Sequence, residues 1–309
     1  MRSLGPTAAG TAVLALLLAT AGPAASAAAA SAAGPATAHA GHRSGHRPGH
    51  AAVRHAVVRH GAARPAGAAR DGGPGVYRGP GFDTCTAPPL DAMQAWWDDS
   101  AYGAVGIYTS GRQRGCSQPR LTADWVARAR SMGWSFVPTH VGRQAPCSTN
   151  TNKPAHIDPD NAAAQGAEEA AEAVTALRAL GIGPGSPVYL DIEAYPRGDG
   201  SCGRAVVDFT TGWTDGLHRA GYLSGFYSSA ESGIADLAAA ARDGAGPLPD
   251  AVWYARWDDK ATTTDGAGAL NPDLWTDHGR IHQHHGNITE THGGISLTID
   301  RDELDAPVG

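Results

Sequence analysis

The chain has 309 residues, which is long enough for one barrel-sized domain with a substantial core. Its formal net charge of −6 includes a basic segment near the N-terminus, so the remainder is more acidic still, and this disfavours a nucleic-acid partner. Although 42% of the residues are hydrophobic, no run approaches the roughly 20 apolar residues of a membrane span, so we expect no membrane-embedded domain.

The N-terminal part divides into two segments that we expect to stay outside the fold. Residues 1–40 have the pattern of a signal peptide, because Arg2 precedes an apolar run at 11–21 and small residues follow. Cleavage sites are available around Ser26 and around His39. Residues 41–75 are rich in His, Arg, Gly and Ala and contain no aromatic residue, which is typical of a disordered linker. The basic linker could contact an anionic cell wall or be only a solvated tether. The remaining residues, 76–309, are the expected folded domain of a secreted, extracellular protein that could be associated with the cell wall in this way.

The folded part begins with a regular alternation of apolar runs and helical patterns, which predicts parallel strands joined by helices. Strands are expected at 77–83, 105–108, 134–141, 187–193 and 222–227, and helices at 89–98, 121–132, 161–180, 204–220 and 232–242. Three more strands are expected at 251–257, 280–285 and 295–300. Only nine residues, 286–294, connect the last two strands, too few for a parallel crossover, so antiparallel pairs are expected there. The prediction is an α/β fold, an irregular TIM-type (β/α) barrel with five βα units followed by three strands largely without helices.

Four carboxylates fall at expected strand ends. Asp191 and Glu193 are two residues apart on one strand, so their side chains point to the same face, about 6.6 Å apart along the backbone. Asp83 closes the first strand and Asp300 the last, and these strands are neighbours in a closed barrel. Because α/β barrels assemble their sites from strand ends, we expect the four acids at one mouth. A pair of carboxylates is the chemistry of glycoside hydrolysis, although any one acid could instead cap a helix or anchor a loop.

Aromatic residues occur near the same strand ends and could stack on sugar rings or fill the core. We take Trp253 and Trp257 as the best candidates for lining a groove. The full set of aromatic candidates is Tyr108, Tyr195, Tyr227, Trp253 and Trp257.

Several short motifs resemble those of the glycoside hydrolase family 25 lysozymes. They resemble more closely a glycoside-hydrolase-like domain of unknown function found in secreted bacterial proteins. The resemblance spans 81–304 and rests on Gly-Phe-Asp at 81–83, Leu-Asp-Ile-Glu at 190–193, Trp-Tyr-Ala at 253–255, a strand with Gln283, and the terminal Ile299-Asp300. It implies a substrate-contacting Gln283. It also implies Glu193 as general acid, with Asp191, Asp83 and Asp300 on the nucleophilic or electrostatic side.

The four cysteines, an even number in an exported chain, predict two disulfides. Three pairings are open. We favour Cys85 with Cys116 and Cys147 with Cys202, because each pair would join the ends of neighbouring strands.

These patterns predict a secreted, monomeric glycosidase of the lysozyme type. It is expected to act on a cell-wall polysaccharide such as a peptidoglycan-like glycan, with no cofactor. One alternative is a non-catalytic module that binds the same glycan. Another is a metal-dependent hydrolase or deacetylase, because His282, His284 and His285 lie close together in the sequence and imidazole with carboxylate is a common zinc set.

Overall fold

The structure, a computed structural model, describes residues 75–309 with the exception of 199, 266, 267, 269 and 271. The predicted signal peptide, its cleavage sites and nearly all of the predicted linker lie outside the described residues.

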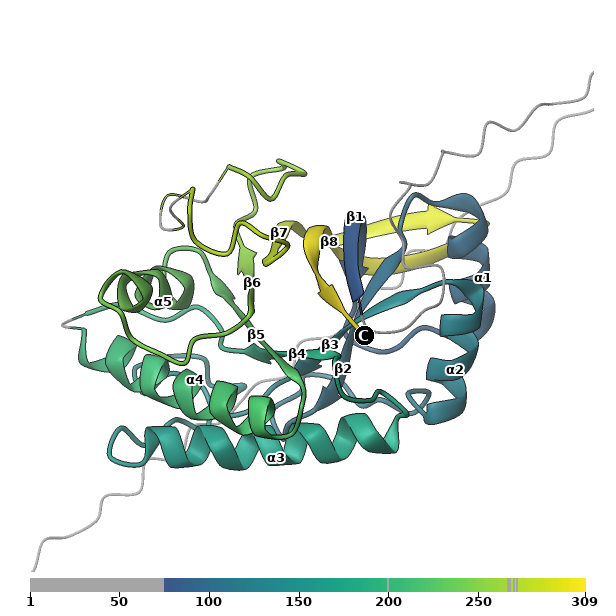
Figure 1. Cartoon of the computed structure of the whole chain (residues 1–309). Helices are drawn as coiled ribbons and strands as arrows, with labels where there is room; N and C mark the ends of the chain where they lie inside the picture. Colours follow the sequence, from purple (N-terminus) through teal and green to yellow (C-terminus); the bar gives the residue numbers. More distant parts are fainter. Residues whose placement is uncertain (1–74, 199, 266–267, 269, 271) are drawn as a thin grey trace, which may run out of the picture. The chain divides into compact units, whose positions relative to one another are not determined.

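Eight strands in the described part close into one barrel in which every strand pairs with its neighbours in sequence (Figure 1). Strands β1 to β7 are parallel, whereas β8 is antiparallel to both β7 and β1. The strands are β1 Gly75–Asp83, β2 Ala104–Ser110, β3 Ser135–His140, β4 Pro187–Asp191, β5 Leu223–Ser229, β6 Ala251–Ala255, β7 Arg280–His292 and β8 Ile295–Val308.

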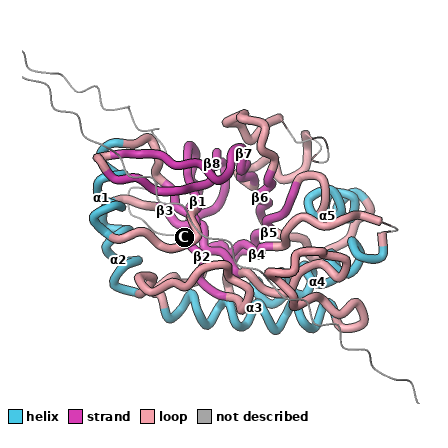
Figure 2. Tube along the Cα trace, turned by 180° about the vertical axis from the view of Figure 1, so that it is seen from behind, coloured by secondary structure: helices cyan, strands magenta, loops and turns pink. Residues whose placement is uncertain are grey.

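Five helices lie among the described residues, one after each of the first five strands, and Figure 2 shows them beside the ring of strands. They are α1 Leu90–Asp99, α2 Ala123–Met132, α3 Ala162–Ala179, α4 Ser201–Arg219 and α5 Gly233–Arg242. Local sequence explains α2 well. Thr122 caps its first turn by accepting from the Trp125 backbone N–H at 3.2 Å, and Gly133 ends it in the left-handed conformation. No helix in the described part of the chain is long and apolar enough to cross a bilayer.

The fold class, the five βα units and the antiparallel pairing of the last strands are therefore as predicted, but the lengths of β7 and β8 are not. The expected connection at 286–294 is mostly strand, because β7 continues to His292 and a tight turn at Gly293 and Gly294 leads into β8. Both glycines have positive φ, as a two-residue hairpin turn requires. The register shifts near His285, and the outer part of the hairpin lies beside α1 (Figure 1).

Apolar side chains fill two regions. One lies between the strands and the helices and contains most of the buried aromatic rings, among them Trp96, Trp134 and Trp213. The other is drawn from the strands alone and is the barrel interior: Tyr77, Ala104, Val137, Tyr189, Ala251, Trp253, Ile281, Leu304, Ala306 and Val308. The interior is therefore packed, and a site can form only at its ends.

Candidate active site

The acidic side chains continue the inward-facing rows of the barrel interior. Since successive side chains on a strand alternate between faces, Asp191 shares the inward face of Tyr189, and Asp302 and Asp300 share that of Leu304. The rows change from apolar to acidic toward the carboxyl ends of the parallel strands. Strand parity thus places carboxylates over a hydrophobic floor.

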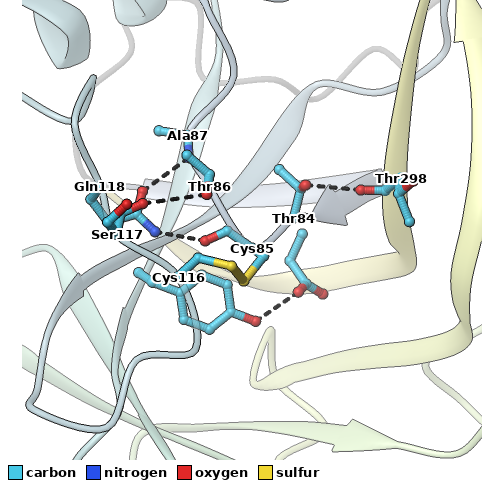
Figure 3. Close-up of a disulfide and its surroundings, with 10 residues drawn as sticks. Thr84, Cys85, Thr86, Ala87, Cys116, Ser117, Gln118 and Thr298 are labelled. Atoms are coloured by element: carbon cyan, nitrogen blue, oxygen red, sulfur yellow. Dashed lines mark hydrogen bonds between the residues drawn. A yellow bond between two sulfur atoms is a disulfide. The ribbon is translucent and has the colours of Figure 1, made fainter. Parts of the chain in front are cut away.

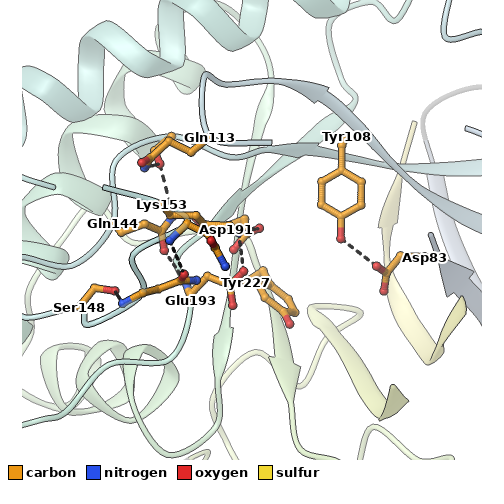
Figure 4. Close-up of polar contacts among 12 residues, drawn as sticks. Asp83, Tyr108, Gln113, Gln144, Ser148, Lys153, Asp191, Glu193 and Tyr227 are labelled. Carbon is orange, nitrogen blue, oxygen red and sulfur yellow. Dashed lines mark hydrogen bonds and ion pairs between the residues drawn. The ribbon is translucent and has the colours of Figure 1, made fainter. Parts of the chain in front are cut away.

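A cleft of about 510 Å³ opens at this mouth. All four acids predicted from the sequence line it together, and the close-up in Figure 4 shows two walls. The lining residues are Asp83, Thr84, Cys85, Thr86, Tyr108, Gly115, Val141, Lys153, Asp191, Glu193, Asn287, Thr298, Ile299 and Asp300.

Asp83 forms the first wall at the end of β1 and is 2% exposed. Its carboxylate accepts hydrogen bonds from the Tyr108 hydroxyl at 2.8 Å and from Gln283 Nε2 at 2.9 Å. Burial raises the pKa of Asp83 to about 7; the charge of the neighbouring Asp300 adds to the rise, and the hydrogen bonds from Gln283 and Tyr108 oppose it. Asp83 can therefore hold or release a proton near neutral pH.

Asp300 lies opposite Asp83 in the pairing of β8 with β1. The expectation that it closes the last strand was wrong, because β8 runs antiparallel and continues for eight more residues to Val308. Asp300 reaches the mouth from the middle of its strand, where its Oδ1 accepts from the Asn287 backbone N–H at 2.5 Å. Burial, and then the charge of Glu193, raise its pKa above the usual range.

Asp191 and Glu193 form the second wall with a lysine between them. Lys153 Nζ lies 3.2 Å from Asp191 Oδ2 and also contacts Glu193 Oε1. Asp191 is 4% exposed, whereas the Glu193 side chain is 36% exposed because Glu193 follows β4 by two residues. Burial raises the pKa of Asp191 to about 6, Lys153 opposes that rise, and Glu193 adds to it.

Gln144 positions this wall from behind and is fully buried. Its Nε2 donates to the Asp191 carbonyl at 2.9 Å, and its Oε1 accepts from the Glu193 backbone N–H at 2.7 Å. Sequence reasoning missed both Gln144 and Lys153, because they lie in an irregular stretch without hydrophobic periodicity. It also missed Asp302, although Asp300 and Asp302 repeat the i, i+2 spacing of Asp191 and Glu193.

The two disulfides have the pairing favoured above, Cys85 with Cys116 and Cys147 with Cys202, at Cα separations of 5.7 and 5.9 Å. The first joins two loops, and the second joins a loop to the first turn of α4. The first borders the cleft and is shown in Figure 3. Beside it, Gln118 Nε2 donates to the Cys85 carbonyl at 2.6 Å.

A family model described as "Rv2525c-like, glycoside hydrolase-like domain" matches residues 94–304, more than half of the chain. The chain belongs to this family. The resemblance noted from the short motifs is therefore confirmed at the level of the family. No curated protein matches the chain.

Among solved structures, this glycoside hydrolase-like chain is similar to an uncharacterized protein of B. stearothermophilus, with 18% identity, 73% of this chain and 95% of that chain covered, and a TM-score of 0.47. It is also similar to the Tat-secreted protein Rv2525c of Mycobacterium tuberculosis, solved in complex with HEPES, with 16% identity, the same coverage and a TM-score of 0.47. A third is a muramidase from Acremonium alcalophilum, with 15% identity, 73% and 92% coverage and a TM-score of 0.43.

Three of the predicted aromatic residues lie at the mouth of this glycoside hydrolase-like barrel. Tyr108 lines the cleft, while the Tyr227 hydroxyl and Trp257 Nε1 donate to the same Gln283 oxygen at 3.0 and 3.1 Å. Trp257 is 57% exposed. Gln283 therefore links the aromatic residues to Asp83, which accepts from its amide nitrogen.

The structure does not bring the other two aromatic candidates to the cleft. Trp253 is buried in the barrel interior, where its Nε1 donates to Asp302 Oδ1 at 2.8 Å. The Tyr195 hydroxyl donates to Asp236 Oδ2 on α5 at 2.7 Å, and Tyr195 is outside the cleft lining. Strand-end position alone could not separate residues of the mouth from residues that fill the core.

The three histidines of β7 are held by different partners. His282 is fully buried, with its ring nitrogens 2.8 and 2.9 Å from the carbonyl oxygens of Thr262 and Arg256. Burial lowers the pKa of His284, and His285 contacts Asp259. The described residues contain no group of three or more His, Cys, Asp or Glu side chains placed to hold a metal ion. The metal-dependent alternative therefore gains no support from this donor set.

Proposed function

We propose that this chain is an exported glycosidase that cleaves glycosidic bonds in a cell-wall polysaccharide, a peptidoglycan-like glycan. The observation that carries the proposal is the convergence of Asp83, Asp191, Glu193 and Asp300 on one cleft. Glycoside hydrolysis needs one carboxylic acid to protonate the leaving oxygen and a second carboxylate to attack, to activate water or to stabilise the oxocarbenium-like centre. Membership of a glycoside hydrolase-like family supports the same chemistry.

The proposed roles follow from exposure. Glu193 is the most accessible acid of its wall and is the proposed general acid, because its side chain can reach a glycosidic oxygen in the cleft. Asp191 and Asp83 are buried, one in each wall, where fixed carboxylates can stabilise positive charge at the anomeric carbon. Asp300 completes the electrostatic side from β8. Trp257, at the rim, offers an exposed ring face for a sugar.

We also propose that the protein works outside the cell. Two disulfides are expected in an oxidising compartment and support this location. Under this proposal, residues 1–40 are the signal peptide, 41–75 a linker that permits association with the cell wall, and 76–309 the working domain, which acts as a monomer.

The decisive experiment is digestion of purified cell walls, and of chitin-like polymers, with mass analysis of the products for wild type beside Glu193→Gln. Wild type should release defined glycan fragments. The variant keeps the shape of the side chain but cannot donate the proton, so we expect turnover to fall at least about 100-fold while binding is retained. If wild type releases no fragment from any of these polymers, the enzymatic proposal fails.

A second candidate is a non-catalytic glycan-binding module, and the contact of Lys153 with Glu193 favours it. A general acid must carry a proton, and the Glu193 carboxylate is engaged by an ammonium group in the ligand-free cleft. Equal binding of wild type and Glu193→Gln to wall polymers, without cleavage by either, would identify the binding module.

A further inference from the structure

Lysine is rare in this chain, and one of its two lysines lies in the cleft. Of 24 basic residues, 22 are arginine, and the lysines are Lys153 and Lys260. Among the described residues that line the cleft, Lys153 is the one Lys, Arg or His. A lysine ammonium is a compact charge that can contact two carboxylates at once, as Lys153 does.

Lys153 is held in place independently of the acids it contacts. The backbone N–H and carbonyl of Ala155, two residues on, bond to Gln113 Oε1 at 2.6 Å and to the Gln144 backbone N–H at 2.9 Å. The disulfide from Cys147 ties the same loop to α4. Glu193, by contrast, follows the end of β4 and is partly exposed. Of the two carboxylates, Asp191 is therefore the fixed partner of the ammonium and Glu193 the movable one.

Asp191 has few other groups that could stabilise a negative charge. Its Oδ1 is buried and has no hydrogen-bond partner, and its Oδ2 is paired with Lys153. His140 on β3 exerts a favourable charge effect, but its ring nitrogens are already bonded to Ser110 and Glu169. The remaining titratable groups that interact with Asp191 are acidic or neutral: Asp83 on β1, Tyr108 on β2, Glu193 after β4 and Tyr227 on β5.

We propose that Lys153 is a positioning residue that commits Asp191 to its carboxylate form during turnover and so leaves Glu193 as the group that exchanges the proton. This inference rests on the proposed glycosidase function and adds to it a residue that gives the two acids different roles. The direction of the pKa shifts agrees: burial raises the pKa of Asp191 to about 6, and Lys153 is the group that most opposes the rise.

The same contacts exclude imine chemistry as the role of this lysine. Burial alone would lower the pKa of Lys153, but the charges of Asp191 and Glu193 raise it above its usual range. The amine is therefore protonated at neutral pH and is not a nucleophile.

The first test needs no catalytic activity. Asp residues labelled at the carboxyl carbon are titrated by NMR in the full-length protein, with the Asp191 signal assigned by Asp191→Asn. In Lys153→Met the Asp191 midpoint should rise by about one pH unit or more, because an opposite charge in contact has been removed. Lys153→Arg should stay near wild type, and Lys260→Met, which alters the other lysine, should change nothing. An unchanged midpoint in Lys153→Met overturns the proposal; if that variant does not fold, Lys153→Gln is judged by the same criterion.

The second test is the pH dependence of kcat/KM on cell-wall glycan. If ionised Asp191 is needed, activity rises as pH rises through its pKa, so Lys153→Met should move this limb to higher pH and lose more activity at pH 6 than at pH 9. A loss that is equal at every pH would indicate a merely structural role and contradict the proposal. If wild type cleaves no glycan, the proposed function fails, whereas the titration still decides whether Lys153 sets the ionisation of Asp191.

Discussion

At the scale of single residues, the acidic end of the barrel contains carboxyl groups that are withdrawn from water. Asp83 and Asp302 are 2% and 3% exposed, and their polar contacts include the neutral donors Tyr108, Gln283 and Trp253. Burial raises the pKa of both carboxyls; the charge of Asp83 raises the pKa of Asp302 further, and the charge of Asp300 raises that of Asp83. Groups of this kind cost folding free energy at neutral pH, which is common where a site is built for proton transfer.

Asp83→Asn tests this cost. The folded pKa of Asp83 is about 7 against an ordinary value of 3.8, so the folded chain binds this proton more tightly than the unfolded chain. The stabilising contribution of the proton is complete below pH 3.8 and is lost as pH rises through 7. Asparagine cannot ionise, so the variant does not lose this contribution. The free energy of unfolding of Asp83→Asn minus that of the wild type should therefore increase by roughly 2–4 kcal/mol between pH 4 and pH 8.

Chemical denaturation at several pH values measures this difference. Asp124→Asn is a suitable control, because Asp124 is largely exposed on α2 and should show no such trend. A difference between Asp83→Asn and wild type that does not vary with pH would mean that Asp83 is ionised in the folded state.

At the scale of elements, two irregular segments place the site. The β7–β8 hairpin supplies Asp300 and packs on α1, where Trp96 Nε1 donates to the Ile295 carbonyl at 2.9 Å and Asp99 accepts from the Gly293 backbone N–H at 2.7 Å. The loop between β3 and α3 supplies Lys153 and is tied to α4 by the Cys147–Cys202 disulfide. The regular strands of the barrel carry Asp83 and Asp191, and these two segments add Asp300 and Lys153.

The two disulfides make a matched pair for testing the loop. Replacing either pair by serines should lower the free energy of unfolding by about 2–4 kcal/mol. The two effects should be similar although the sequence separations are 31 and 55 residues, because the entropy of loop closure grows only slowly with length. Only Cys147→Ser with Cys202→Ser should also raise the Asp191 titration midpoint, since that disulfide holds the loop of Lys153. Denaturation and NMR titration measure the two effects. Equal Asp191 titration in both double variants would show that the disulfide does not position Lys153.

At the scale of the whole molecule, the barrel interior changes from apolar at one end to acidic at the other. The apolar end supplies stability through buried aromatic and aliphatic side chains such as Tyr77, Tyr189 and Leu304. This division lets one end of the same strands carry unfavourable buried charge while the other offsets its cost.

The barrel alone should therefore be the stable unit. A chain that begins at Asp71 keeps all of β1, and we expect its thermal midpoint to lie within about 2 °C of a chain that begins at Gly41. Thermal unfolding followed by circular dichroism, with glycan binding as a second readout, measures this. A clear loss of stability or binding in the shorter chain would place earlier residues within the folded unit.

The sequence by itself determined the barrel, because its signals are local: alternating apolar runs mark strands, and helix caps such as Thr122 mark the units between them. It also predicted that Asp191 and Glu193 lie together, although the strand expected to carry both ends at Asp191 and the contact they share is Lys153. It placed Asp300 at the mouth but at the wrong point of its strand, because the length and direction of β8 depend on pairing with β1 and β7.

Only the tertiary structure decided which other residues join the acids in the cleft. Lys153 reaches the acids from a loop 38 residues earlier than Asp191, and nothing in its local sequence indicates that contact. The same holds for Trp253 and Tyr195, whose positions near strand ends match those of true cleft residues. Which of several equivalent side chains is buried, paired or exposed is set by contacts between distant segments, and those form only when the barrel closes.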